Sequence, residues 1–196
     1  MMGLDPIETL GVLAGVVAVW LTVRENVWCW PIGLVNVLLF IVVFYRARLY
    51  ADMGLQVVYV ALCLYGWWAW LHGGSGAGPL AVGRTPPRWR WGLLGAGIVA
   101  WVGLALFLAG YTDAALPWWD SATTSFSLVA QYMQARKWLG NWLVWIAVDV
   151  VYVGIYIVKG LYPTAVLYAM FLLLAIAGWR AWRASPGDAS AEAVAA

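Results

Sequence analysis

Residues 49–70, LYADMGLQVVYVALCLYGWWAW, recur in outline as residues 161–182, LYPTAVLYAMFLLLAIAGWRAW. Both stretches begin with Leu-Tyr, and both end with a Gly-Trp pair followed three residues later by another Trp. Corresponding positions are 112 residues apart, as residues 49 and 161 are. Just upstream, Asn26 and Trp30 recur as Asn141 and Trp145 at an offset of 115, which a three-residue insertion in the intervening loop would reconcile. The second half of the chain is therefore predicted to be a copy of the first.

The composition is that of an integral membrane protein. The 196 residues are 65% hydrophobic and 10% charged, whereas a soluble domain has about 25% charged residues. Such a chain cannot cover a surface that faces water. Its net charge of +2 is too small to suggest nucleic acid as a partner. An internal repeat in so apolar a chain predicts a transport fold built from two copies of a helical unit.

Seven segments are predicted to cross the membrane, because a span needs about 20 mostly apolar residues. They are residues 6–23, 27–45, 50–71, 91–110, 117–135, 141–158 and 163–182. The fifth is the most polar, with Asp120, Gln131 and Gln134 among several hydroxyl residues. It is kept as a span because it occupies the place of the first span in the other copy. The fold class is therefore all-α, with seven transmembrane helices.

The number of helices predicts how the copies are arranged. Three helices end on the opposite face from where they began, so a fourth helix is needed to start the second copy in the original direction. This gives a 3+1+3 arrangement with two parallel repeats. The first repeat covers residues 1–72, a cytoplasmic loop 73–90, a linker helix 91–110, the second repeat 111–184 and a flexible tail 185–196.

The distribution of Lys and Arg predicts the orientation. One side carries eight: Arg24, Arg84, Arg88, Arg90, Arg136, Lys137, Arg180 and Arg183. The other carries three: Arg46, Arg48 and Lys159. Because positive residues accumulate on the cytoplasmic side, the N-terminus is expected outside and the C-terminus inside.

Residues near the predicted span ends include many of the 16 tryptophans. We interpret nine of them as an interfacial belt: Trp67, Trp68, Trp70, Trp89, Trp91, Trp118, Trp119, Trp179 and Trp182. Cys29 and Cys63 imply no disulfide framework, and no metal-ligand spacing is present. No nucleophile–base pair or phosphate-binding loop is visible either, so the sequence predicts no enzyme, no metal and no cofactor.

A helical stripe on the sixth span differs from this belt. Its members are spaced by 4, 3, 4, 3 and 4 residues, which places them on one face: Trp138, Trp142, Trp145, Asp149, Tyr152 and Tyr156. Asp149 falls near the bilayer midplane, where a carboxylate costs about 2.5–3.5 kcal/mol. A partner or a cavity is therefore expected, whether Asp149 binds a solute or a neighbouring helix.

Polar stripes on three other spans are expected at the same depth, and together they predict a polar cavity walled by aromatic rings. Such a cavity suits a flat, aromatic, hydrogen-bonding solute. The predicted site consists of Asn36, Gln56, Tyr59, Thr124, Gln131, Asn141, Trp142, Trp145 and Asp149.

Three segments resemble the PnuC family of bacterial vitamin transporters. They are NVWCWPIGLVNVLLF (residues 26–40), the run 49–70 quoted above, and residues 120–182, which contain DSATTSFSLVAQ and the Trp–Asp helix. The resemblance implies nicotinamide riboside uptake, with thiamine or riboflavin carried by relatives. It also implies a SWEET-like 3+1+3 fold, a homotrimer in the bacterial inner membrane, and facilitated diffusion with trapping by a cytosolic kinase.

Other functions remain open from the residues alone. Thiamine and nicotinamide riboside are both cationic, so Asp149 and facing indoles favour either one, whereas riboflavin is neutral. Proton-coupled transport through Asp149 is a further alternative. A membrane receptor or scaffold that does not transport could be built from the same helices.

Overall fold

The structure is a computed structural model that describes residues 6–46, 48, 50–74, 78–112 and 116–185. These residues form seven α-helices, and outside them the described residues contain one isolated β-bridge, between Gly83 and Trp138. The chain divides into two compact units, Met1–Ala81 and Val82–Ala196. All but the first residue of the tail predicted over 185–196 lies outside the described part.

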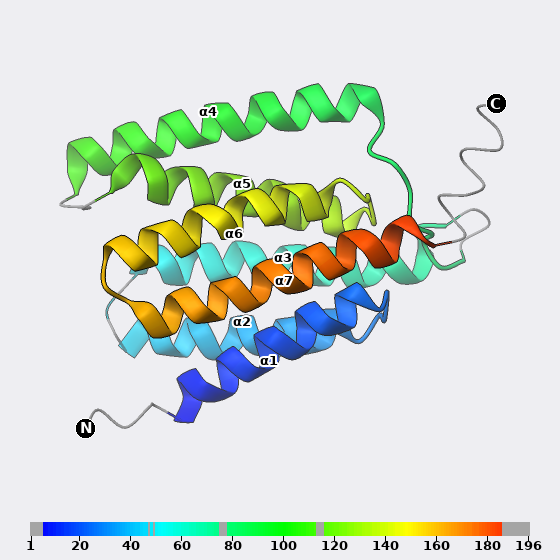
Figure 1. The fold of residues 1–196 in the computed structure, drawn as a ribbon, viewed down its shortest axis with the longest axis horizontal. Coiled ribbons are helices and arrows are strands. Elements are labelled where there is room, and N and C mark those ends of the chain that lie inside the picture. Colours follow the sequence, from blue (N-terminus) through cyan, green and yellow to red (C-terminus); the bar gives the residue numbers. More distant parts are fainter. Residues whose placement is uncertain (1–5, 47, 49, 75–77, 113–115, 186–196) are drawn as a thin grey trace. The chain divides into compact units, whose positions relative to one another are not determined.

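The first unit contains three helices, α1 (Pro6–Val23), α2 (Cys29–Arg46) and α3 (Tyr50–His72). Helix α2 packs against both α1 and α3 (Figure 1). The Asn36 amide donates to the Gly11 carbonyl at 2.7 Å, which ties α2 to α1. The middle helix is thus the element that joins this unit.

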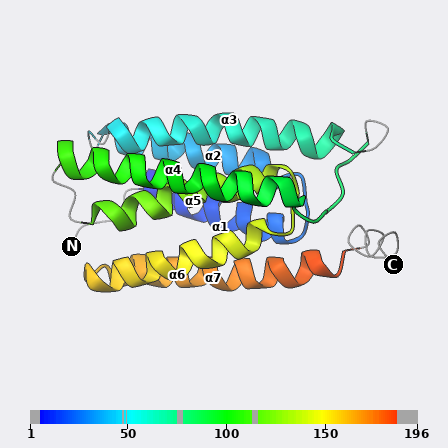
Figure 2. The same ribbon diagram turned by 90° about the horizontal axis from the view of Figure 1, so that it is seen from above.

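The second unit contains α4 (Pro87–Tyr111), α5 (Pro117–Ala135), α6 (Asn141–Val158) and α7 (Tyr162–Arg183). Helix α6 packs against α5 and α7, as α2 does between its neighbours, and α4 packs against α5. Figure 2 shows α6 and α7 running side by side. Before α4, Gly83 exchanges backbone hydrogen bonds with Lys137 and Leu139, which pins this segment to the α5–α6 turn.

The observed helices match the predicted spans within two residues, except that α4 begins at Pro87 rather than at residue 91. Proline is favoured in the first helical turn because its missing N–H has no partner there in any case, and α4, α5 and α7 all begin this way. Among the described residues, six helices are apolar and long enough to span a bilayer. Helix α5 is the seventh, and its polar face explains the difference.

The turns between the helices have the same backbone conformation in both units. Four described residues have positive φ, Glu25 (55°), Lys137 (54°), Arg48 (58°) and Gly160 (70°), and they form two pairs at the offset of 112. After Glu25 and Lys137, the next N–H closes the preceding helix by bonding back to the carbonyl of Leu21 or Met133 at 3.0 Å. This is the Schellman pattern of helix termination.

A buried tryptophan marks the same position in each unit. Trp30 on α2 packs edge-on against Trp70 of α3, with ring centroids 5.5 Å apart, and Trp142 on α6 does the same with Trp182 of α7 at 5.3 Å. Each indole covers a glycine, Gly66 or Gly178, at which an added Cβ would overlap the ring.

These contacts correct two expectations. Trp30 corresponds to Trp142, not to Trp145, so the offset is 112 throughout and the inferred three-residue insertion does not exist. Trp70 and Trp182 are buried rather than interfacial, with 3% and 0% of their surface exposed. Five of the predicted belt residues are exposed as expected: Trp68, Trp89, Trp91, Trp118 and Trp119.

The paired turns give a test of backbone strain. Gly160 has φ of +70° and open space where a Cβ would lie, so Gly160→Ala should destabilise by about 1 kcal/mol through the backbone alone. Arg48→Gly, at the corresponding position, should be neutral or stabilising. Thermal unfolding of purified protein in detergent measures both, and a loss of stability for Arg48→Gly similar to that for Gly160→Ala would contradict the argument.

The indole–glycine contact predicts a pair of coupled substitutions. Gly178→Ala should destabilise by about 1–3 kcal/mol because the methyl group overpacks against Trp142. The same change should cost much less when Trp142 is already Leu, which a double-mutant cycle of unfolding free energies detects. Gly154→Ala on α6 is the matched control, since open space surrounds it. Additive effects of Gly178→Ala and Trp142→Leu would refute the contact.

Candidate functional site

A cluster of tyrosines joins α6 to α7 in the second unit. The ring centroids of Tyr152 and Tyr168 are 4.5 Å apart, those of Tyr156 and Tyr168 are 5.1 Å apart, and Tyr152 stacks on Tyr156 at 5.8 Å. The Tyr156 and Tyr168 hydroxyls hydrogen bond to one another. The cluster therefore presents aromatic faces and hydroxyl groups from two helices at one place.

Helix α5 supplies the polar groups opposite this cluster. Its hydroxyl residues Thr123 and Ser127, one turn apart, are buried, and both lie within hydrogen-bonding reach of the Tyr152 hydroxyl. Such bonds help to hold α5 against α6, as is common between membrane helices. The polarity that weakened the prediction of α5 as a span thus serves this contact.

Asp149 is the buried carboxylate of this region. Only 4% of its surface is exposed, and it lies close enough to Tyr168 for the two side chains to interact electrostatically. Within the described part of the chain, the structure gives its carboxylate no hydrogen bond and no ion pair. A charge at this depth needs compensation, so Asp149 is suited to binding a cationic or hydrogen-bonding solute.

Trp145 and Asn141 lie on the same helix but make different contacts. The Trp145 indole N–H donates to the Gln134 side chain of α5 at 3.2 Å. The Asn141 amide donates to the Trp138 carbonyl at 2.7 Å, while its side-chain oxygen is buried and has no partner among the described residues. Trp145 therefore faces the polar side of α5, whereas Asn141 closes the start of α6.

Trp142 has a visible packing role. It is 1% exposed and wedged between Gly178 and Trp182. Its indole N–H has no partner in the described residues, and neither has that of Trp30 in the first unit. Both rings thus act as hydrocarbon wedges in the structure, and a contact between Trp142 and a solute stays a prediction.

The remaining predicted residues divide between the units. Thr124 and Gln131 are half-buried and lie seven residues apart on one face of α5, the helix that also carries Gln134. Asn36, Gln56 and Tyr59 belong to the first unit, where Asn36 already bonds to α1 and the other two are half-buried on α3. The structure thus brings Trp145, Asp149 and the α5 residues into one unit.

Comparison of the repeats identifies a residue that the prediction missed. Gln56, which was predicted, corresponds at the offset of 112 to Tyr168, which was not. The same offset relates the Phe40–Phe44 pair, with rings 5.7 Å apart, to Tyr152–Tyr156 at 5.8 Å. Gly11, which lies under Phe40, corresponds to Thr123, which bonds Tyr152. The packing is shared, and the hydroxyl groups belong to the second copy.

An ion pair borders the cluster at one end. Lys159 lies 3.7 Å from Asp120, linking the end of α6 to the first turn of α5, and both side chains are about one-third exposed. Among the residues described, no group of His, Cys, Asp and Glu is placed to hold a metal ion.

These features define a multi-pass, α-helical membrane protein with an internal repeat and a polar cluster inside its second unit. The family model described as nicotinamide mononucleotide transporter matches residues 5–184, and the chain belongs to that family.

Relatives agree over most of the chain. The nicotinamide riboside transporter PnuC of Escherichia coli is 28% identical over 201 residues, which cover 90% of this chain and 84% of the relative. The riboflavin/roseoflavin transporter RibM of Streptomyces davaonensis is 29% identical over 178 residues, covering 89% and 83%. A crystal structure of the vitamin B3 transporter PnuC has the same fold, with a TM-score of 0.70 and 22% identity over 90% of this chain and 80% of that one.

The contact between α5 and α6 predicts the effect of removing one hydroxyl. Tyr152→Phe, which restores the residue type of the first repeat, should lower the free energy of unfolding by about 1 kcal/mol, because the interaction of the Tyr152 hydroxyl with Thr123 and Ser127 is lost. Phe40→Tyr is the reciprocal change and should also destabilise, since Gly11 offers it no hydroxyl. Thermal unfolding measures both. Unchanged stability for Tyr152→Phe would mean that the hydroxyl contact contributes nothing.

Proposed function

We propose that this protein transports nicotinamide riboside across the bacterial inner membrane by facilitated diffusion. The observation that carries this proposal is the buried, unpaired carboxylate of Asp149 beside the tyrosine cluster. The pyridinium ring of nicotinamide riboside is flat and positively charged, so it can stack on tyrosine and face a carboxylate. The ribose hydroxyls can bond with the polar residues of α5. Family membership and the PnuC relatives support the same solute.

The unphosphorylated riboside fits better than the mononucleotide that gives the family its description. A phosphate group needs cationic or N–H donors, and all eleven Lys and Arg lie in end turns of helices or in connecting segments. Asp149 would repel a phosphate placed near it. The substrate class is therefore a cationic nucleoside.

The wider architecture is part of this proposal. The seven helices span the membrane in a 3+1+3 arrangement with parallel repeats, the N-terminus is outside and the C-terminus cytoplasmic, and the protein is a homotrimer without enzymatic activity. The positive charges and the repeat support this arrangement. Uptake against a gradient then depends on a cytosolic kinase that traps the solute by phosphorylation.

Riboflavin is the second candidate, because the riboflavin/roseoflavin transporter RibM is 29% identical to this chain. Its flat ring system would also stack on the tyrosine cluster, but it is neutral and gains nothing from Asp149. Thiamine, which is cationic, is an alternative on charge alone. The charge of the solute therefore separates these candidates.

Asp149→Asn tests the proposal in proteoliposomes. The substitution should weaken nicotinamide riboside binding by about 1.5–3 kcal/mol, roughly ten- to hundredfold, because a charged contact becomes neutral. Transport of riboflavin, if any, should not change. Leu173→Asn, at an exposed position on α7, is a control for an added amide. If the wild-type protein moves no labelled riboside, or if Asp149→Asn binds it equally well, the proposed site is wrong.

The same vesicles test the mechanism. With the membrane potential clamped at zero, facilitated diffusion fills them only until the concentrations inside and outside are equal. The clamp is needed because a membrane potential of 100 mV changes the free energy of moving a univalent cation across the membrane by about 2.3 kcal/mol. Accumulation above equality driven by a proton or sodium gradient would refute uniport.

A further inference from the structure

A cavity of the Val82–Ala196 unit lies outside the candidate solute site. Its volume is about 740 Å³, and its walls come from the segment before α4, the first turns of α4 and α6, the inner part of α5 and the end of α7. None of the residues predicted to bind the solute lines it. The cavity is therefore a separate feature that transport of a vitamin does not explain.

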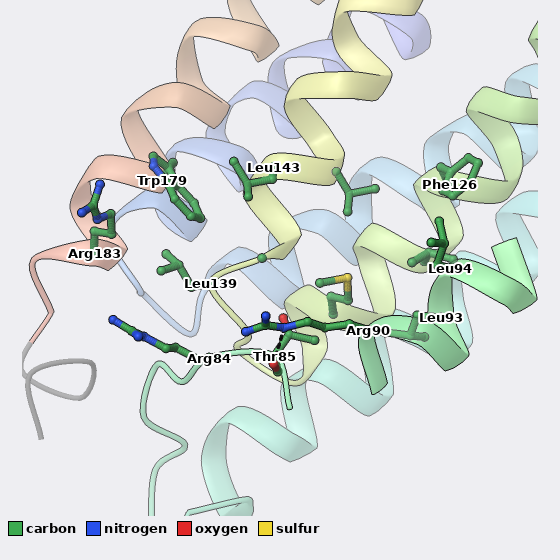
Figure 3. A pocket seen from close by; sticks show the side chains of 14 residues that line it. Arg84, Thr85, Arg90, Leu93, Leu94, Phe126, Leu139, Leu143, Trp179 and Arg183 are labelled. Atoms are coloured by element: carbon green, nitrogen blue, oxygen red, sulfur yellow. Dashed lines mark hydrogen bonds between the residues drawn. The ribbon is translucent and has the colours of Figure 1, made fainter. Parts of the chain in front are cut away.

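Three arginines surround one side of this cavity. Arg84 precedes α4, Arg90 lies in its first turn and Arg183 is in the last turn of α7 (Figure 3). The Arg90 Nε donates to the Thr85 carbonyl at 2.8 Å, which fixes the base of this side chain and leaves its other N–H groups available. No Asp or Glu is among the lining residues. The lining residues therefore include three cations and no carboxylate.

A buried polar atom lies at the base of this charged side. Thr85, another lining residue, is 6% exposed, and its hydroxyl oxygen has no hydrogen-bond partner in the described part of the chain. It is packed so tightly against Gly140 that a Cβ added there would meet it. An unpaired buried hydroxyl costs free energy, so the protein leaves a polar group at this side of the cavity unsatisfied.

The rest of the wall is apolar. Leu94 on α4, Phe126 on α5 and Leu143 on α6 line it away from Arg84 and Arg183 (Figure 3). Leu94 and Leu143 are 43% and 51% exposed, which is expected of side chains that face hydrocarbon. A ligand must therefore be anionic at one end and apolar at the other.

We propose that this cavity binds an anionic phospholipid, with the headgroup phosphate among Arg84, Arg90 and Arg183 and an acyl chain along Leu94, Phe126 and Leu143. Arginine binds phosphate through paired N–H groups, and basic pockets between membrane helices are suited to acidic headgroups. The arginines lie at helix ends or just before them, where headgroups are expected, whereas Leu94 and Phe126 lie further along α4 and α5. The lipid would join α4, which packs on α5, to the end of α7.

Native mass spectrometry of the full chain in detergent tests this proposal, with phosphatidylglycerol and phosphatidylcholine of identical acyl chains as probes. Phosphatidylglycerol should bind and raise the midpoint of thermal unfolding, whereas phosphatidylcholine should bind about tenfold more weakly. The triple variant Arg84→Gln, Arg90→Gln, Arg183→Gln should lose about tenfold or more of the phosphatidylglycerol affinity. Equal binding of the two lipids by the wild-type protein would overturn the proposal.

Matched variants distinguish lipid binding at this cavity from a general effect of the protein's positive charge. Arg24→Gln, Arg88→Gln and Arg180→Gln remove the same charge from residues that do not line the cavity, and together they should change affinity less than about twofold. Leu143→Trp should weaken lipid binding by filling the cavity, whereas Leu106→Trp on the exposed side of α4 should not.

Three outcomes would refute the lipid assignment. The control triple could lose as much affinity as the cavity triple, which would mean that binding is delocalised. Inorganic phosphate at millimolar concentration could displace the lipid, which would make the cavity a free-anion site. The cavity triple could instead change the oligomeric mass without changing lipid binding, which would make this face a contact between copies of the chain.

Discussion

The structure depends on an indole ring that packs on a bare glycine backbone. Trp30 over Gly66 and Trp142 over Gly178 bring α2 to α3 and α6 to α7 closer than any side chain at the glycine would allow. In a bilayer the hydrophobic effect does not drive helices together, because lipid tails are as apolar as the side chains. Close packing of this kind is therefore a main source of helix association. The two indoles have buried N–H groups with no partner in the described part of the chain, so shape rather than hydrogen bonding determines the contact.

The two copies share this framework and differ in chemistry. At corresponding positions the first has Gly11, Phe40 and Phe44, and the second has Thr123, Tyr152 and Tyr156. Helix positions, turn conformations and aromatic contacts are the same in both. Because the framework does not depend on these hydroxyls, one copy can acquire a polar interior while the other keeps an apolar one. Asp149 belongs to the polar copy, and its counterpart in the first copy is the apolar Val37.

Most of the fold could be predicted from the sequence, because long apolar segments and a repeat leave few alternatives. The helix ends were correct except at α4, where Pro87 begins the helix. The repeat was misaligned at Trp30 because Asn26 and Asn141 are the same residue type, which suggested that they are equivalent. In the structure the counterpart of Asn141 is Cys29. Trp70 and Trp182 were misassigned for a different reason. A position near a helix end gives depth in the membrane, and only the neighbouring helix determines whether the ring faces lipid or protein.

The contrast between the two sides of α6 has a mechanical consequence. Toward α7 the helix is held by a rigid ring against backbone, which does not tolerate sliding because close-packed interiors resist small displacements. Toward α5 it is held by hydroxyl groups and by Trp145 on Gln134, and these bonds can be exchanged for water or solute at little net cost. Helices α6 and α7 are therefore expected to move together, and shear between α5 and α6 should be easier than shear between α6 and α7.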